Sequence, residues 1–328
     1  MTPSASIDRT PPAVMVAVPT YRRPDDLRRL VRSLDPVVVY ATTVGAASRV
    51  DILVIDNDPD ASGLAVLPDD APVIRVHERS PGVAAARNRA LDESIGHDVL
   101  VFIDDDETPA ASDWLARLLE TARDHRADAV AGPVLTVVDG GIDPWIEVGG
   151  FFARRHTRGI LTGEVIQRAA TNNLLLDLAI VRASGVRFDD RFGRTGGEDS
   201  LFTSQLHRAG ARMVWCAEAL VLDHLPETRR TRAHALGRVR GMSAAGVRVG
   251  LVLAPTRSGR AVVRAKAPLA GVARIAAGVA RTATGALVRS ERLDATGRRD
   301  TMRGVGALEG AAGHIRIHYG EPVRGANR

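Results

Sequence analysis

The sequence predicts an α/β fold with a mostly parallel central sheet, flanking helices and a basic, helical C-terminal extension. Three observations predict it. Short apolar runs alternate with helical patterns through the first half of the chain, which is typical of βαβ units. Aspartate or a polar turn directly follows three of these runs. Beyond Leu225 the composition changes to arginine, alanine and glycine.

Each expected strand is a short apolar run bounded by turn residues. The first run stops at Pro19, and the second ends in an Asp-Asn-Asp-Pro loop that starts at Asp56. The expected strands are 14–18, 51–55, 73–76, 99–103, 129–138, 172–180 and, as one or two strands, 212–222.

Each expected helix begins at a recognisable start signal. Pro24 followed by Asp25 and Asp26 predicts a helix through Leu34, because proline and acidic residues favour the first helical turn. Ser112 is the expected N-cap of another helix. The remaining expected helices are 82–94, 112–124 and 198–209, whereas 149–152 and 154–156 are expected to form a loop and a short strand.

Composition limits the class of protein. The chain has 328 residues, of which 45% are apolar and 25% charged, which fits one large domain with an appendage or two domains. The single cysteine, Cys216, excludes an intramolecular disulfide framework and a cysteine-rich zinc site. A polar, proline-rich start predicts no secretory signal, and no run of eighteen uncharged apolar residues occurs. We therefore expect a cytoplasmic protein, either soluble or peripheral at the inner face of the plasma membrane.

Charge is distributed unevenly along the chain. Residues 225–328 hold 20 basic and 6 acidic side chains, a balance of +14, while residues 1–224 have a balance of −9. A basic segment suits an anionic membrane surface or nucleic acid. Nucleic acid is disfavoured here, because aromatic side chains that would stack on bases are lacking.

A helical wheel over residues 269–292 gathers arginines on one side and larger apolar residues on the other. The arginines are Arg274, Arg281, Arg289 and Arg292, and the apolar residues are Leu269, Val272, Val279 and Leu287. This pattern predicts a helix that lies on an anionic membrane surface. Glycines at 271, 278 and 285 leave an equal alternative, a helix that packs its small-residue face on the rest of the protein.

Three consecutive carboxylates, Asp104, Asp105 and Asp106, directly follow the expected strand 99–103. Such carboxylates repel one another, and a hard divalent cation with oxygen ligands relieves that repulsion. Aspartate-rich turns also occur as solvated loops. The ends of parallel strands meet at one sheet edge, however, where ligands bind. The cluster therefore favours a site for Mg²⁺ or Mn²⁺.

Other candidates are weaker when taken singly. No glycine-rich phosphate loop is present, so phosphate binding would depend on the cation and on Arg22, Arg79 or Arg87. Glu198 and Asp199 follow two glycines at a helix start, which suits either helix capping or a general base facing an open crevice. His224 ends an apolar run, and an isolated histidine is more often a surface or core residue than a metal ligand.

Five motifs in this order resemble those of the inverting glycosyltransferases of family 2, which have the GT-A fold. They are VPTYRRP at 18–24, VIDN at 54–57, GVAAARN at 82–88, FIDDD at 102–106 and TGGED at 195–199. The resemblance covers roughly residues 13–224. It implies a Rossmann-like nucleotide-sugar-binding half at 13–138 and an acceptor-binding half at 139–224, between a flexible N-terminus at 1–12 and the extension at 225–328.

The resemblance also implies roles for single residues. Asp56 would bind the base, Asp104 the ribose, and Arg87 would lie close to the nucleotide. The other residues implied to contact the nucleotide sugar are Pro19, Thr20, Tyr21, Arg22 and Asp105. Asp106 and His224 would hold the metal, Mn²⁺ or Mg²⁺. Asp199 would be the general base, with Glu198 beside it to orient or bind the acceptor.

The implied activity is a metal-dependent transfer from a nucleotide-diphosphate sugar to a hydroxyl of a cell-envelope or exopolysaccharide glycan, or of a lipid-linked acceptor. A sugar nucleotidyltransferase is one alternative, but it would carry a glycine-rich basic segment after the first strand. A non-catalytic peripheral membrane protein that retains the fold is another. It would have lost or buried Asp106 or Asp199, and the sequence retains both.

Overall fold

The computed structural model describes residues 10–154 and 157–314. The chain forms two compact units. The described residues of the sheet unit are 10–137, 154, 157–190 and 198–224, and those of the helical unit are 138–153, 191–197 and 225–314. Most of the expected flexible N-terminus, and positions 155 and 156 of the expected short strand, lie outside the described residues.

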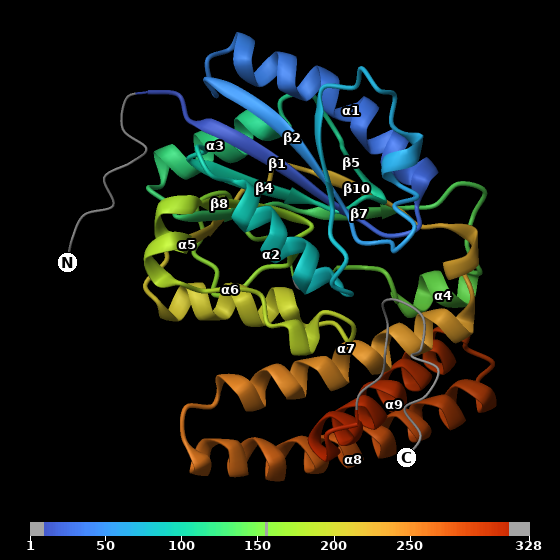
Figure 1. The fold of residues 1–328 in the computed structure, drawn as a ribbon. Coiled ribbons are helices and arrows are strands. Elements are labelled where there is room, and N and C mark those ends of the chain that lie inside the picture. The colour runs from blue at the N-terminus through green and yellow to red at the C-terminus, as the bar shows by residue number, and fades with distance from the viewer. Residues whose placement is uncertain (1–9, 155–156, 315–328) are drawn as a thin grey trace. The chain divides into compact units, whose positions relative to one another are not determined.

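The sheet unit is built on a seven-stranded sheet in the order β3-β2-β1-β4-β8-β6-β9 (Figure 1). Only β8 runs antiparallel to its neighbours, so the predicted mostly parallel sheet is confirmed. In spatial order the strands are β3 (Val73–His77), β2 (Arg49–Asp56), β1 (Ala13–Thr20), β4 (Val99–Ile103), β8 (Asn173–Asp177), β6 (Ala129–Ala131) and β9 (Met213–Trp215).

A second sheet of three short strands lies in the same unit. Its strands, in order, are β5 (Glu107–Pro109), β10 (Val221–His224) and β7 (Val134–Val137). β10 pairs antiparallel with β5, which sets Asp223 opposite Glu107. This small sheet therefore places the end of β10 beside the turn that follows β4.

Helices cover both faces of the large sheet because the strand residues alternate between its faces. Val14, Val16 and Val18 pack in one apolar cluster with α1 and α3, whereas Met15 and Ala17 pack in another with α2, α5 and α6. The helices are α1 (Pro24–Thr43), α2 (Val83–Glu93), α3 (Trp114–Asp124), α5 (Leu178–Ser184) and α6 (Glu198–Arg208). Short 3₁₀ turns occur at Leu64–Val66, Asp190–Phe192 and Glu227–Arg229.

Several expected elements have different bounds in the structure. α1 continues past Leu34 and through Pro36, because Val37 and Ala41 extend its buried stripe. The expected strand at 129–138 is two strands in different sheets, separated at Pro133, which lacks the N–H that a ladder needs. The expected strand at 172–180 ends at Asp177, whose carboxylate caps α5 by accepting a hydrogen bond from Ala179 N at 2.7 Å.

Two helix starts also differ from expectation. α3 begins at Trp114 with Asp113, not Ser112, at its N-cap. Residues 144–149, most of which were assigned to no element from the sequence, form α4 (Pro144–Gly149), where Pro144 occupies the first turn and Asp143 accepts a hydrogen bond from Trp145 N at 2.9 Å. This N-cap followed by proline is a start signal that the sequence carries.

The C-terminal extension is helical, as predicted. It forms α7 (Arg232–Leu253), α8 (Arg257–Leu287) and α9 (Glu291–Ala312). α9 packs along both α7 and α8 through glycines, since a Cβ at Gly278 on α8 would lie 2.6 Å from Gly297 O on α9. Among the described residues, none of the helices is sufficiently long and apolar to cross a bilayer.

The helix expected at 269–292 is interrupted. α8 ends at Leu287, Arg289 has a φ of 53°, and Ser290 caps α9 by accepting a hydrogen bond from Leu293 N. Arg289 and Arg292 therefore do not extend the arginine side of α8, and the predicted four-arginine face is wrong in its second half. The three glycines of α8 are buried, which is the small-residue packing that the alternative predicted, but their neighbours lie on α9.

Candidate active site

The ends of β1, β2 and β4 meet at one edge of the large sheet, as predicted. Thr20 is opposite Asp56 in the β1–β2 register, and Asp104 directly follows the last residue of β4. Asp105 connects β4 to β1 because its carboxylate accepts hydrogen bonds from Thr20 Oγ1 at 2.8 Å and Tyr21 N at 3.3 Å. The predicted nucleotide-contacting residues at the end of β1 and the acidic cluster therefore form one assembly.

Arg23 is a member of this assembly that the sequence analysis did not single out. Its Nη1 donates to Asp105 Oδ1 at 2.7 Å and lies 2.8 Å from Asp106 Oδ2. Burial alone would lower the pKa of Arg23, but the charges of Asp105 and Asp106 outweigh it and raise that pKa above its usual value. Its place in the motif at 18–24, one residue before a helix start, was the available signal.

Asp106 has an unusual electrostatic environment. Burial raises the pKa of Asp106 to about 8, with further increases from Asp104, Asp105 and Asp223 and an opposing effect from Arg23. A bound cation would relieve this repulsion, and carboxylate oxygen is the ligand that Mg²⁺ and Mn²⁺ prefer. Asp106 therefore fits the metal role predicted for it.

His224 lies directly beside Asp106. Its backbone N–H donates to Asp106 O at 2.9 Å, and its Nε2 lies 2.8 Å from Thr108 Oγ1. Within the described ranges, no three histidine, cysteine or acidic side chains converge as a complete metal site. An ion here would have few protein ligands and would complete its shell with water or substrate phosphates, as Mg²⁺ usually does.

Glu107 stabilises the acidic turn at Asp104 through the hydrogen bonds of its buried carboxylate. It is 1% exposed, and it accepts hydrogen bonds from Asn172 Nδ2 at 2.5 Å and from Asp104 N at 3.3 Å. Burial, with the nearby charge of Asp104, raises the pKa of Glu107 well above its ordinary value. Neither Glu107 nor Asn172 was predicted from the sequence. A buried acid directly after an aspartate run leaves no separate signal in the sequence.

The carboxylate of Asp56 is used within its own loop. Its Oδ1 accepts a hydrogen bond from Asp58 N at 2.9 Å, and its Oδ2 accepts from Gly63 N at 2.7 Å and Leu64 N at 3.0 Å. Arg22 stabilises the same loop by donating from Nε to Asp58 Oδ1 at 3.0 Å. A contact between Asp56 and the nucleotide base stays a prediction. In the structure Asp56 stabilises the loop at the end of β2.

Arg87 connects the two acidic motifs of the sequence. From α2 its Nη1 lies 2.6 Å from Glu198 Oε1, and its Nη2 lies 3.2 Å from Asp104 Oδ1. Arg87 itself is buried. The acidic turn after β4 and the start of α6 therefore lie side by side, 94 residues apart in sequence from Asp104 to Glu198.

Glu198 and Asp199 begin α6 after Gly196 and Gly197, whose φ values of 76° and 98° are ones that other residues rarely adopt. Burial raises the pKa of Glu198 to about 7, with the Arg87 charge opposing and Asp199 contributing. Glu198 Oε2 is buried and has no hydrogen-bond partner among the described residues. Asp199 is half-buried, and its Oδ1 accepts from Ser200 N at 2.6 Å.

The structure thus brings together most of the predicted site residues within the sheet unit. Direct contacts join Thr20, Tyr21, Asp104, Asp105, Asp106, Arg87, Glu198 and His224. Pro19 and Asp56 lie at the same edge through the β1–β2 register. Arg79, a candidate for phosphate binding, is exposed.

Comparison with known proteins decides the family. The sequence model described as "Glycosyl transferase family 2" matches residues 15–173. The chain is 36% identical over 223 residues to the succinoglycan biosynthesis protein ExoM of Rhizobium meliloti (strain 1021), covering 66% of this chain and 69% of that protein. The chain belongs to glycosyltransferase family 2. It is a glycosyltransferase, as predicted, rather than a sugar nucleotidyltransferase or a non-catalytic relative.

Solved structures show that this family 2 chain has the GT-A fold, as predicted. The mannosyltransferase PcManGT of Pyrobaculum calidifontis, solved with GDP-Man and Mn²⁺, has a TM-score of 0.59 at 17% identity, covering 92% of this chain and 88% of that chain. GalNAc-T7, solved with UDP, GalNAc and Mn²⁺, has a TM-score of 0.51 at 14% identity. This likeness covers 74% of the present chain, which spans about half, 48%, of the GalNAc-T7 chain.

Proposed function

We propose that this family 2 glycosyltransferase moves a sugar, with inversion, from a nucleotide-diphosphate sugar to a hydroxyl of a glycan or lipid-linked acceptor. The observation that carries this proposal is the double contact of Arg87, 3.2 Å from Asp104 and 2.6 Å from Glu198. Arg87 thereby holds the carboxylates that suit a donor, at Asp104 and its neighbours, beside the carboxylates that suit an acceptor, Glu198 and Asp199. A transferase needs both groups in reach of one reacting carbon.

The proposed donor side comprises the ends of β1, β2 and β4. Asp106 and His224 would hold a divalent cation, Mn²⁺ or Mg²⁺, and the Mn²⁺ in both structural neighbours supports this choice. The chemistry that such an ion supplies when bound is neutralisation of the charge on a departing diphosphate. Asp104 would bind the ribose, while Thr20, Tyr21 and Asp105 form the floor beneath the nucleotide.

The proposed acceptor side is the start of α6. Asp199 would take the proton of the acceptor hydroxyl, and Glu198 would orient that hydroxyl through its unpaired Oε2. A base on one face of the sugar and a leaving diphosphate on the other permit a single in-line displacement. One such step inverts the configuration at the anomeric carbon.

The proposed acceptor class is a bacterial exopolysaccharide or cell-envelope glycan, free or carried on a lipid. The support is the relative named as a succinoglycan biosynthesis protein, which is 36% identical. The proposed place of action is the cytoplasmic side of the plasma membrane, where a lipid-linked acceptor would be met by a peripheral enzyme.

A panel of nucleotide-diphosphate sugars tests the proposal. Each is titrated into the protein by calorimetry with and without Mn²⁺, and donor hydrolysis is scored in parallel. We expect at least one donor to bind only with Mn²⁺, and Asp106→Ala to abolish that binding. Asp69→Ala, which removes a carboxylate whose side chain is fully exposed, is the matched control and should bind the donor normally.

Two results would count against the proposal. Wild-type donor affinity in Asp106→Ala, still dependent on Mn²⁺, would remove Asp106 from the metal site. Failure of every donor to bind or be hydrolysed, by a protein that melts cooperatively, would argue against nucleotide-sugar transfer.

A further inference from the structure

Helix α8 presents a long apolar face outside the core of its unit. Val262, Leu269, Val272, Val279 and Leu287 are 48% to 85% exposed. At 100° per residue these side chains fall within an arc of about 100°. The other residues of this arc between 262 and 287 are exposed alanines. A stripe about 38 Å long is therefore built only from alanine, valine and leucine.

The opposite side of α8 explains how the helix is held in place. Gly271, Gly278 and Gly285 are buried, and their closest non-local neighbours lie on α9. Packing on α9 therefore does not use the apolar stripe. Large exposed apolar patches on soluble proteins generally mark a binding surface, and this one has no occupant within the described residues of the helical unit.

The segment that contains α8 carries charges of one sign. No acidic residue occurs from Thr228 to Ser290, a segment with thirteen basic residues. α8 itself carries six of them: Arg257, Arg260, Arg264, Lys266, Arg274 and Arg281. Arg257, Arg264 and Lys266 flank the stripe on the helical wheel. Arg260, Arg274 and Arg281 fall on the side of the buried glycines, where Arg281 pairs with Asp300 of α9. α8 therefore combines an apolar face with cationic edges.

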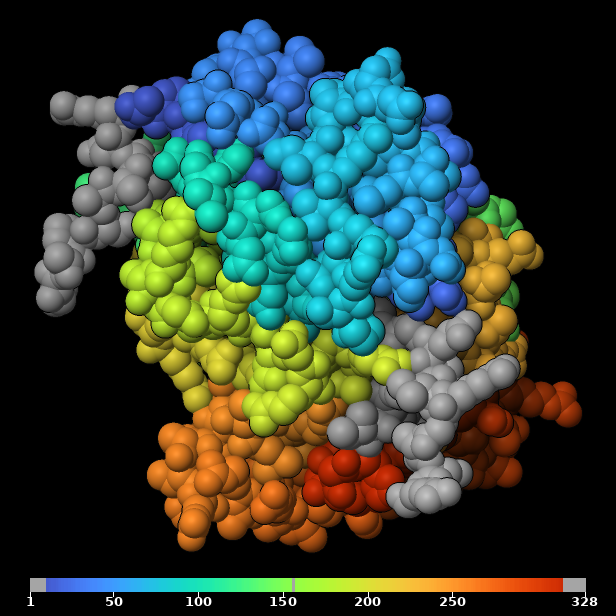
Figure 2. Space-filling model, in the orientation of Figure 1, coloured from blue at the N-terminus to red at the C-terminus, as the bar shows by residue number. Residues whose placement is uncertain are grey.

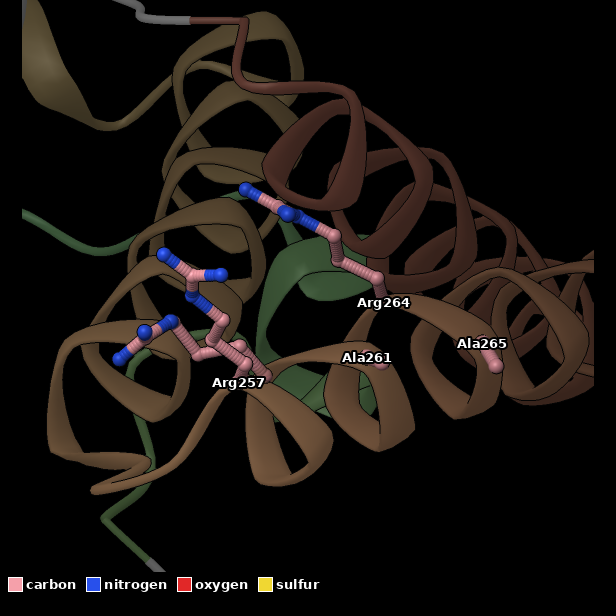
Figure 3. A pocket seen from close by; sticks show the side chains of 5 residues that line it. Arg257, Ala261, Arg264 and Ala265 are labelled. Carbon is pink, nitrogen blue, oxygen red and sulfur yellow. The ribbon is translucent and has the colours of Figure 1, made fainter.

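A cationic hollow lies at the start of α8. An open hollow of about 610 Å³ is lined by Arg257, Arg260 and Arg264 together with Ala261 and Ala265. Figure 3 shows the side chains of Arg257 and Arg264 extending from this part of the helix. Figure 2 shows the end of α7 and the start of α8, in orange, at the molecular surface. Guanidinium groups beside small apolar side chains suit a phosphate head group attached to an acyl chain.

We propose that α8 docks on an anionic phospholipid surface, with its apolar stripe at the acyl boundary and the flanking Arg257, Arg264 and Lys266 on the head-group phosphates. This is the arrangement of an interfacial helix that lies in the membrane plane. A second copy of the chain is a poorer occupant, because two surfaces with this charge would repel each other. The inference rests on α8 and its charges and does not depend on the proposed donor or acceptor.

Sedimentation with vesicles tests the docking surface on the full chain. We expect binding to phosphatidylglycerol vesicles at low salt, weaker binding at high salt, and little binding to pure phosphatidylcholine. Leu269→Ser combined with Leu287→Ser should lower the partition coefficient at least about tenfold, since two large side chains leave the acyl boundary. The matched control is Ile95→Ser with Leu161→Ser, two exposed apolar residues of the sheet unit.

A second pair of variants tests the cationic edge. Arg257→Gln with Arg264→Gln should weaken binding at low salt at least about tenfold and reduce its salt dependence. Arg32→Gln with Arg158→Gln removes the same charge from exposed positions elsewhere and should change binding little. Circular dichroism melting verifies that all four variants fold, which is expected because every substituted side chain lies at the surface.

Three results would overturn the proposal. The first is no binding of the wild-type protein to phosphatidylglycerol at low salt. The second is wild-type binding by the serine variant on α8 or by the arginine variant. The third is a dimer, measured by light scattering, that the α8 serine variant dissociates while its lipid binding stays unchanged. That result would assign the stripe to a second copy of the chain.

Discussion

Arg87 Nη1 lies 2.6 Å from Glu198 Oε1, and both side chains are about 5% exposed. This ion pair joins the buried side of α2 to the first turn of α6. Removing one member of a buried pair leaves a charge without compensation, which is far more costly than losing an exposed pair. The contact therefore has a structural role besides its place in the proposed site.

Arg87→Met is expected to destabilise the protein by about 3–5 kcal/mol, because Asp104 and Glu198 both lose the guanidinium that contacts them and Glu198 must either stay charged without a partner or take up a proton. Arg87→Met combined with Glu198→Met should recover part of this loss. The measurement is urea unfolding at neutral pH. Arg89→Met, which breaks the exposed pair with Glu93 on the same helix, is the control and should cost less than about 1 kcal/mol. Equal losses at both positions would contradict the buried-pair account.

The pKa of Glu198 predicts a dependence of stability on pH. In the folded chain this pKa is raised from 4.5 to about 7, mainly by burial. Below about pH 4.5 Glu198 is protonated in both states; between there and about pH 7 only the folded state keeps the proton. Its contribution to stability is therefore lost as the pH rises through about 7.

Glu198→Gln should remove this effect. We expect the unfolding free energy of the wild type, relative to the variant, to fall between pH 5 and pH 8 by on the order of 1–3 kcal/mol. Urea unfolding of both proteins at the two pH values measures it. Glu120→Gln, at a position about 40% exposed, is the control and should follow the wild type. A relative stability that rises with pH would show that Arg87 outweighs burial and lowers this pKa.

The sequence was a good guide where local signals and the fold agree. The end of β1, the acidic turn after β4 and the start of α6 all carry local patterns, and contacts of Asp105 and Arg87 join these segments in the structure. The family resemblance named the same residues. Pro133 and Asp177 also mark the ends of strands in the sequence. Each lies in or beside a long apolar run, however, and that run predicted one longer strand.

Contacts between distant segments could not be predicted from the sequence. Arg23, Glu107 and Asn172 support the acidic turn through bonds that only the folded chain creates. Likewise the wheel over 269–292 assumed one helix, whereas Arg289 adopts a left-handed backbone and separates α8 from α9. Which face of α8 is buried depends on α9, which the periodicity of α8 alone does not reveal.

Arg23 is expected to compete with a divalent cation for Asp106. Its guanidinium lies 2.8 Å from Asp106 Oδ2, so it already neutralises the carboxylate that would bind the ion. Arg23→Met should therefore bind Mn²⁺ more tightly than the wild type in the absence of nucleotide, by about tenfold, measured by electron paramagnetic resonance of free Mn²⁺. Arg22→Met, whose guanidinium bonds to Asp58 instead, should change Mn²⁺ affinity little. Weaker Mn²⁺ binding in Arg23→Met would show that Arg23 organises the site rather than competing for it.

Replacing glycine by alanine should have opposite effects at Gly278, which contacts α9, and at Gly246, where an added Cβ would contact nothing. A Cβ at Gly278 would lie 2.6 Å from Gly297 O and 2.7 Å from Thr301 N, so Gly278→Ala should destabilise by about 1–3 kcal/mol. Gly246 on α7 has open space around it, and Gly246→Ala should stabilise by about 0.5–1 kcal/mol through helix propensity. Melting temperatures measure both. A stabilising effect at Gly278 would mean that the two helices separate readily.

Asp199→Asn separates the proposed base from a structural role in the first turn of α6. Asparagine keeps the shape of the side chain and an oxygen that can accept the hydrogen bond from Ser200 N, so this variant should melt near the wild type. It loses the charge that accepts a proton, and general-base assistance typically contributes about 10²- to 10⁴-fold in rate. We therefore expect normal donor binding and sugar transfer that is at least about a hundredfold slower.

Glu198→Gln provides the comparison at the neighbouring carboxylate. Because Glu198 Oε1 pairs with Arg87 while Oε2 is unpaired, its loss should act more on acceptor affinity than on the maximal rate. Steady-state kinetics with the acceptor varied separates kcat from KM for each variant. Near-normal turnover of Asp199→Asn with an inactive Glu198→Gln would move the base to Glu198. Normal turnover of both would exclude the start of α6 as the source of the base.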